Sequence, residues 1–350
     1  MHMADALISP VVGGFMLAAT LGVAAYSVKK IKGDIDEKKI PLMGVMAAFV
    51  FASQMINFSI PGTGSSGHIG GGLLLSIVLG PYAAFLSMAS VLLIQALFFA
   101  DGGLLAYGCN VFNLGFFTCF IAYPFIYKKI AKEGSTSARK SAAAMVAAIL
   151  GLQMGAFGVV LETLLSGKTE LPFGTFVLLM QPIHLAIGVV EGLVTAAIIA
   201  FVAKTSPAIL ERADSRDGLG FAPVRRVIAV LGVAALLVGG VLSWFASTYP
   251  DGLEWSMEKV SGSAELEVNG SVYQGLAELQ RKTAFLPDYT FRAKVAEPDA
   301  TSAWPTIDGG TSVAGLLGGA MTLALAVIAG LCVRAVKRRS KRQGSATPLA

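Results

Sequence analysis

Apolar runs separated by short polar segments make up most of the 350-residue chain. Nine of them are long enough, or nearly long enough, to cross the hydrocarbon of a bilayer, which takes about 20 residues in a helix. Gly80 and Pro81 separate the short third run from the fourth as a turn at the membrane edge. The pattern predicts an all-α integral membrane protein of seven plus two spans. The runs lie near 10–28, 41–58, 69–81, 82–99, 105–127, 141–165, 172–203, 225–247 and 312–333.

Composition indicates the same class of protein. Hydrophobic residues make up 55% of the chain and charged residues 14%, whereas soluble domains carry about a quarter charged residues. Cys109, Cys119 and Cys332 lie in apolar segments without paired spacing, so we expect no disulfide framework. The first run has neither a basic flank ahead of it nor a clear cleavage site, which indicates a retained helix rather than a signal peptide.

Lysine and arginine are unevenly placed along the chain. Of the 27, five fall in 29–39, five in 128–140, five in 204–226 and six in 334–342. With nine spans these segments share one face, and cytoplasmic loops carry an excess of positive charge. We therefore expect the amino terminus and the loop around His68 outside and the carboxyl terminus in the cytoplasm. This placement explains the net charge of +5. We therefore expect the lipid bilayer as a partner and do not expect nucleic acid binding.

The spans fall into two units joined by a polar segment. The second unit is expected to hold a small, mostly irregular extracytoplasmic insert at 248–311. In this insert Asn269 and Gly270 predict a tight turn, and the stretch from Tyr273 to Lys282 is a candidate helix. We predict a seven-span domain at 1–203 and a cytoplasmic linker at 204–224. A two-span accessory domain at 225–340 and a disordered tail at 341–350 follow.

The amino terminus can act as a small chelator. The α-amine of Met1, the backbone nitrogen of His2 and the His2 ring can reach one ion and close adjacent chelate rings. A fourth nitrogen would complete a planar set, the geometry that copper(II) and nickel(II) favour. His68, in a loop rich in glycine and serine on the same predicted face, is the candidate. The alternative is that His2 stands there by chance and that His68 belongs to a flexible connector.

Polar residues at the outer ends of the spans predict a pocket around His68. Polar groups at membrane depth are costly and usually face a bundle interior or a cavity. Such groups can fix the ring tautomers of ligating histidines, or they can simply hydrogen-bond between helices. The predicted set is Asn57, Ser65, Gln95, Asp101 and Asn110.

Three further polar residues, His184, Glu191 and Glu162, lie within the apolar runs. His184 and Glu191 are two helical turns apart on one face. This spacing fits the metal or proton path of an ion-coupled secondary transporter or channel, and it fits a buried structural pair. A third interpretation is an interaction protein whose outer module recruits a partner. Two enzyme interpretations fail on their motifs. HExxH is absent, which argues against an intramembrane zinc protease, and the glycine-rich loop at 62–67 lacks the Gly-Lys-Ser/Thr ending of a phosphate loop.

Six separated segments of the first unit carry a family resemblance: 1–10, 56–68, 79–82, 95–104, 108–113 and 184–195. They resemble the CbiM/NikM family, the substrate-binding membrane components of energy-coupling-factor (ECF) transporters for nickel and cobalt, and the resemblance covers about 1–203. Residues 225–340, with Pro-Asp-Gly-Leu-Glu at 250–254, look like the small accessory component of the same systems. The whole chain therefore resembles a fused NikMN-type protein.

The resemblance implies a seven-helix bundle that captures Ni²⁺ or Co²⁺, as transported substrate, at the outer face of a prokaryotic cell membrane. It implies the ligands that the chemistry suggested: the Met1 amine, the His2 amide and ring, and His68. Uptake would need an ECF transmembrane coupling subunit and a cytoplasmic ATPase from other genes, so this chain is not expected to be an enzyme. Met3 and Ala6 depart from the family's usual start without changing the chelating atoms. Planar nitrogen ligation suits low-spin nickel and favours Ni²⁺.

Overall fold

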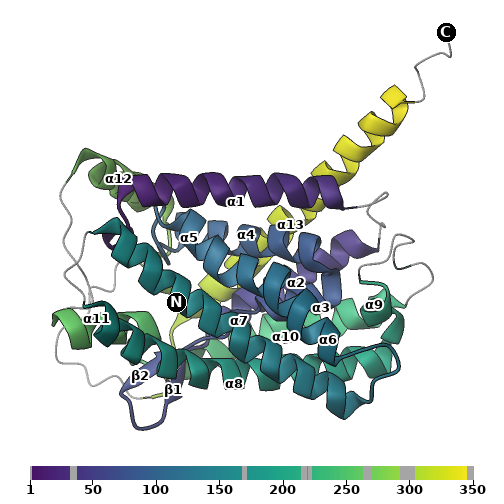
Figure 1. The fold of residues 1–350 in the computed structure, drawn as a ribbon, viewed down its shortest axis with the longest axis horizontal. Coiled ribbons are helices and arrows are strands. Elements are labelled where there is room, and N and C mark those ends of the chain that lie inside the picture. The colour runs from purple at the N-terminus through teal and green to yellow at the C-terminus, as the bar shows by residue number, and fades with distance from the viewer. Residues whose placement is uncertain are drawn as a thin grey trace.

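The computed structural model describes residues 2–31, 38–167, 172–213, 219, 223–262, 270–291 and 304–344, with side chains up to 336. The long helices lie side by side as a bundle (Figure 1). Within the described residues, six helices are long and apolar enough to cross a membrane. The all-α membrane class predicted from the sequence is confirmed. The six are α1 (Pro10–Lys30), α4 (Pro81–Phe98), a rod at Tyr107–Ile130, α7 (Ser137–Ser166), α8 (Phe173–Thr205) and α13 (Gly309–Gly344).

The rod changes its winding along its length. α5 (Tyr107–Val111) leads into η2 (Phe112–Tyr127), which has the wider turns of a π-helix, and α6 (Lys128–Ile130) ends it. Pro124 lies inside η2 and cannot donate a backbone hydrogen bond. Apart from this change of winding, the rod coincides with the fifth apolar run.

The third apolar run does not form a spanning helix, and that part of the prediction is wrong. Only Gly72–Leu79 is helical (α3), and all eight residues are buried. A helix of this length rises only about 12 Å. Gly71, at φ +78°, precedes the helix, and Gly80, at φ +77°, ends it before Pro81. Because such positive φ angles suit glycine, the run is interrupted by its own glycines although it is apolar throughout.

An antiparallel hairpin precedes α3, where the sequence predicted only a turning loop. β1 (Phe58–Ile60) pairs with β2 (Ser65–Gly67), with Ser59 opposite Ser66. Gly62 and Gly64 adopt positive φ in the connection, which lets the chain reverse tightly. The hairpin lies at the same end of the bundle as α11 (Gly252–Ser261) (Figure 1).

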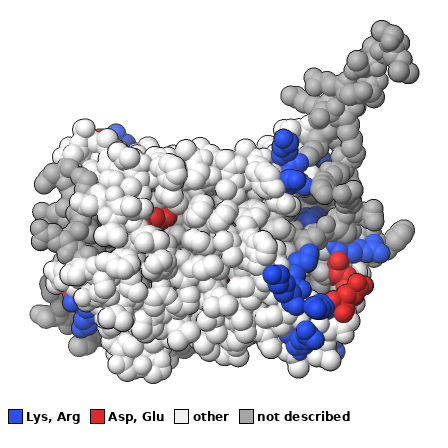
Figure 2. All heavy atoms as spheres, viewed as in Figure 1, with Lys and Arg blue, Asp and Glu red and all other residues white. Residues whose placement is uncertain are grey.

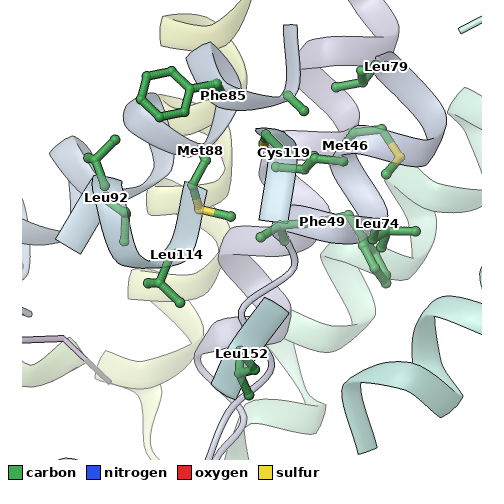
Figure 3. Packing of buried hydrophobic residues seen from close by; sticks show 14 of the residues in the cluster. Met46, Phe49, Leu74, Leu79, Phe85, Met88, Leu92, Leu114, Cys119 and Leu152 are labelled. Atoms are coloured by element: carbon green, nitrogen blue, oxygen red, sulfur yellow. The ribbon is translucent and has the colours of Figure 1, made fainter. Parts of the chain in front are cut away.

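α2 (Lys39–Gln54) lies at the centre of the bundle and is buried along nearly its whole length. α10 (Val224–Gly240) and α13, the two arms of the second unit, both pack against it. A helix that is apolar all round belongs in a core. Side chains such as Phe49, Leu74 and Leu114 join α2, α3 and η2 into one hydrophobic cluster (Figure 3). The second unit therefore packs directly on the first.

The insert between α10 and α13 contains more helix than the sequence predicted. α11 and α12 (Ser271–Thr283) are followed by the 3₁₀ turn η4 (Pro287–Tyr289). Asp251 and Glu254 form a capping box that starts α11, a signal that the sequence analysis missed. Asn269, at the predicted tight turn, lies outside the described residues.

Two polar segments predicted to be irregular also contain helix. α9 (Pro207–Glu211) lies within the predicted linker. α13 continues to Gly344, past residue 340 where a disordered tail was expected. Arginine, lysine and glutamine are good helix formers, so the basic end of α13 extends the helix until the glycine.

Figure 2 shows a nearly uncharged wall between the two ends of the bundle. Most of the visible Lys and Arg lie at the end where Figure 1 places α6 and α9. Large apolar side chains of α1 and α8, such as Val11, Phe15 and Leu178, are exposed. Because lipid can cover apolar surface that water would not favour, the wall fits a bilayer. The chain is a multi-pass membrane protein.

Candidate metal site

The structure brings His2 and His68 together at the end of the bundle opposite α6. Their ring centroids are 4.9 Å apart and the ring planes differ by 26°. The His2 side chain is 5% exposed, and His68 is buried, not exposed in a flexible connector. The rings belong to residues 66 positions apart, and only the fold of the amino-terminal segment brings them into contact. Met1, whose amine was predicted as a ligand, lies outside the described residues.

Backbone hydrogen bonds hold the amino-terminal segment in this position. The N–H of Met3 donates to Asn110 Oδ1 (2.7 Å), and Asn110 Nδ2 donates back to the Met3 carbonyl (3.2 Å). The N–H of Gly103 donates to the same carbonyl (2.9 Å). A Cβ at Gly103 would collide with Asp5. Asn110, predicted as a pocket residue, thus fixes the amino-terminal segment that carries His2.

Asp101 binds the His2 ring directly. Its Oδ1 lies 2.7 Å from His2 Nδ1, and its Oδ2 accepts the hydroxyl proton of Tyr289. Burial alone would raise the pKa of Asp101, but the His2 ring and the Tyr289 hydroxyl lower it, to about 2. The carboxylate therefore accepts a hydrogen bond from Nδ1–H. In the neutral imidazole this leaves the lone pair on Nε2. Nε2 is buried and has no hydrogen-bond partner among the described residues.

His68 is neutral and oriented by its neighbour. Its Nδ1 donates to the Ile69 carbonyl at 3.0 Å, so the lone pair lies on Nε2. Burial is the largest cause that lowers its pKa, to about 3. A neutral imidazole is the form that binds a metal ion, and His68 keeps it throughout the physiological range.

The orientation of His2 matters for the predicted chelate. A ring closed through the backbone nitrogen of His2 and its own imidazole has six members when it uses Nδ1, and Asp101 occupies this atom here. Completing that chelate requires the imidazole to turn away from Asp101. Among the described residues no three or more His, Cys, Asp or Glu side chains are placed to hold an ion.

Glu191 holds the loop that follows His68. Its carboxyl oxygens accept the N–H groups of Gly70 (2.8 Å) and Gly71 (3.0 Å). Gln54 Nε2 donates to the Gly70 carbonyl (2.8 Å), and Gln95 Nε2 donates to Gln54 Oε1 (2.9 Å). α8, α2 and α4 thus fix the backbone next to the histidine. The sequence marked Glu191 and Gln95 as polar groups in apolar runs but missed Gln54, which carries the same signal.

The other predicted intramembrane residues have separate partners. His184 Nδ1 donates to the Met180 carbonyl (2.8 Å) within α8. Glu162 on α7 accepts from Asn113 Nδ2 (2.7 Å). In the part of the chain that the structure describes, no hydrogen bond joins any two of His184, Glu191 and Glu162. The structure therefore does not bring the three together into a relay.

Asn57 and Ser65 have contacts away from the two rings. The Ser65 hydroxyl bonds to the Thr63 hydroxyl (2.8 Å), and the main-chain carbonyl of Asn57 accepts the N–H of Ser247 (2.7 Å). Neither side chain hydrogen-bonds to His2 or His68 within the described residues.

The insert of the second unit covers the end of the bundle where the two histidines meet. The N–H of Ser66, two residues before His68, donates to the Pro250 carbonyl (2.8 Å). The Tyr273 hydroxyl donates to the Ile8 carbonyl (2.8 Å). Gln280 Nε2 donates to the carbonyls of Ala96 (2.9 Å) and Gly102 (2.8 Å). Nothing in the sequence of the insert marked these contacts.

Comparison with known proteins gives consistent matches along the chain. Residues 2–209 match the family described as the cobalt uptake substrate-specific transmembrane region (CbiM), and 225–335 match the PDGLE domain. The chain is 34% identical to a protein of Archaeoglobus fulgidus named as a fused nickel transport protein, NikMN, over 93% of this chain and 96% of the relative. It is 30% identical to the cobalt transport protein CbiM of Geobacter sulfurreducens, over 63% of this chain and 65% of the relative. A crystal structure of a truncated transition metal transporter matches with a TM-score of 0.52 and 29% identity, covering 58% of this chain and 99% of that one.

Proposed function

Since the chain belongs to the CbiM family of nickel and cobalt transport components, we propose that it captures Ni²⁺ or Co²⁺ where His2 and His68 meet. The observation that carries this proposal is the contact of two buried imidazole rings across 66 residues of sequence. Imidazole is a good ligand for a divalent transition metal, and the contact places two imidazole rings side by side.

The proposed ligands are four nitrogens: the Met1 amine, the His2 amide and ring, and the His68 ring. A planar nitrogen set favours low-spin Ni²⁺ over Co²⁺. Loading turns the His2 ring so that Nδ1 leaves Asp101 and joins the chelate. Asn110 and Glu191 keep the two ligand-bearing segments in place during this change.

We further propose that this end of the bundle faces outside and that the carboxyl terminus lies in the cytoplasm. The basic residues at the opposite end support this orientation. Transport would be ATP-driven through an ECF coupling subunit and an ATPase on other chains, because this sequence has no phosphate-binding loop. Residues 1–203 would form the metal-binding domain and 225–340 the accessory domain.

The test is metal binding by the purified full-length chain with its native amino terminus, compared with a variant that has one extra residue before His2. The insertion keeps every side chain but moves the α-amine one residue away from the histidine. We expect stoichiometric nickel or cobalt in the wild type and its loss in the variant. The matched control is a one-residue insertion after Gly134, in an open loop, which should bind as the wild type does.

Equal binding in the two amino-terminal forms would show that the terminus is not a ligand. The site to test would then be His184 and Glu191. That alternative, an ion-coupled secondary transporter, predicts gradient-driven uptake by this chain alone in proteoliposomes without ATP. The separate hydrogen-bond partners of His184, Glu191 and Glu162 give it less support.

A further inference from the structure

A cavity of about 450 Å³ lies beside His2, between the first unit and the insert. The amino-terminal segment from His2 to Leu7 and the loop at 100–103 form one wall, and α11, α12 and Asp288 form the other. Glu254 and Gln274 in its wall are exposed, so the cavity communicates with solvent. Neither unit encloses it alone.

The side chains of this cavity carry one sign of charge. Among the described residues five carboxyl groups line it and no Lys or Arg side chain does; Arg281 lines a neighbouring hollow instead. The negative charge of Asp251 is the largest cause that raises the pKa of Glu254, which is the effect expected where negative groups crowd. The five are Asp5, Asp101, Asp251, Glu254 and Asp288.

A second observation points to a cation rather than to a structural cluster. His2 lines the cavity with a side chain that is 5% exposed, and its Nε2 has no hydrogen-bond partner among the described residues. The carboxyl groups are too dispersed to coordinate an ion, since no group of three or more His, Cys, Asp or Glu is placed to do so in the described part of the chain. The cavity can therefore attract a cation without holding it tightly.

We propose that this cavity is an antechamber that collects hydrated divalent metal ions and delivers them to His2 and His68. The inference rests on the proposed function. A dication with six waters takes up roughly 200 Å³, at about 30 Å³ per water, and fits within the cavity. Clefts lined by one sign of charge concentrate counter-ions and raise association rates by about 10- to 1,000-fold, an effect that salt weakens. The insert thus acts in metal entry, because it supplies three of the five carboxyl groups.

The experiment measures the rate at which Ni²⁺ binds to the full-length chain in detergent, followed by the visible absorption of the nickel–nitrogen complex. The test variant is Glu254→Gln with Asp288→Asn. Glutamine keeps the capping box at Asp251, and asparagine tolerates the φ of +50° at position 288. The control is Glu258→Gln with Glu278→Gln, which removes the same charge from exposed positions on α11 and α12 that do not line the cavity.

In the test variant we expect the second-order rate constant to fall about fivefold at low ionic strength, with an unchanged dissociation rate and a flatter salt dependence. At about 1 M salt, where the Debye length is about 3 Å, the variant and the wild type should converge. The control should remain within about twofold of the wild type. An unchanged rate constant, an equal fall in the control, or an effect confined to dissociation would overturn the antechamber. Failure of the wild type itself to bind nickel would instead overturn the proposed function.

Discussion

Replacing Glu191 with alanine should loosen the His68 loop more than replacing it with glutamine. The carboxyl oxygens accept the N–H groups of Gly70 and Gly71 at 2.8 and 3.0 Å. Alanine leaves both N–H groups buried without an acceptor, and glutamine leaves one, because its amide keeps one acceptor oxygen. Each buried donor without a partner costs about 1–3 kcal/mol. The expected loss is thus about 2–6 kcal/mol for alanine and about 1–3 kcal/mol for glutamine.

This loss divides between metal affinity and stability. If glutamine acts only on the placement of His68, the dissociation constant for nickel rises about 5- to 150-fold. Any remainder lowers the thermal stability of the metal-free protein. Both are measured on the full-length chain in detergent, by chelator competition and by thermal unfolding. Gln153→Ala is the matched control, because Gln153 Nε2 donates to the Gln181 carbonyl between α7 and α8 (2.8 Å) and not to the His68 loop. In this variant the thermal stability of the metal-free protein should fall, while its affinity for nickel should not change.

Equal affinity in the wild type and both Glu191 variants would refute the reasoning that this carboxyl group holds the loop. If glutamine abolished binding as completely as alanine, the charge rather than the hydrogen bonds would be essential. That result would favour the proton path through His184 and Glu162.

Three further predictions concern the amino-terminal side of the site. Metal affinity should weaken as pH falls from about 8 to 5.5, because an α-amine has a reference pKa near 8 and must lose its proton to bind a metal. His68 does not contribute to this change, since burial lowers its pKa to about 3 and keeps the ring neutral. An affinity that stays constant over this range in nickel titrations would argue against amine ligation. Tyr289→Phe removes the hydroxyl that donates to Asp101 and should lower the free energy of unfolding by about 1.5–3 kcal/mol, so unchanged thermal stability would contradict the assigned bond. Gly103→Ala should weaken nickel binding by displacing the amino-terminal segment, whereas Gly14→Ala, with open space around it, should not; equal affinities would show that the segment tolerates the shift.

The sequence predicted the membrane class and most helices because both follow from local patterns. Each of the nine apolar runs contains a helix among the described residues, and six of these helices are long and apolar enough to cross a membrane. α2 and α10 are shorter, with 16 and 17 residues, and the third run, at 69–81, was predicted too long. The length predicted for the run at 69–81 followed from the hydropathy of the whole run. The backbone conformations of Gly71 and Gly80 limit the helix to the eight residues of α3. Hydropathy measures how well a segment suits lipid, and it does not register where a glycine breaks the helix.

For the candidate site, the chemistry of the residues predicted which histidines to pair but not how they are held. His2 and His68 were singled out because imidazoles and a free amine suit a transition metal, and the structure places the two rings in contact. The hold of Glu191 on the loop could not be predicted, because its acceptors face backbone N–H groups, which every residue carries. The bond from Tyr289 depends on how the insert docks, and no local pattern encodes that.

Asp101 connects the first unit to the insert of the second unit through hydrogen bonds, and it does so beside His2, a proposed metal ligand. One of its oxygens binds the His2 ring, and the other accepts the hydroxyl of Tyr289 from the insert. If loading turns the ring away, Asp101 loses one partner, and its bond to Tyr289 changes in strength. Because coupling between two equilibria is reciprocal, docking of the insert must then alter metal affinity by the same factor by which metal alters docking. The accessory unit can thus influence capture without supplying a ligand, since a single carboxylate connects its position to the orientation of His2.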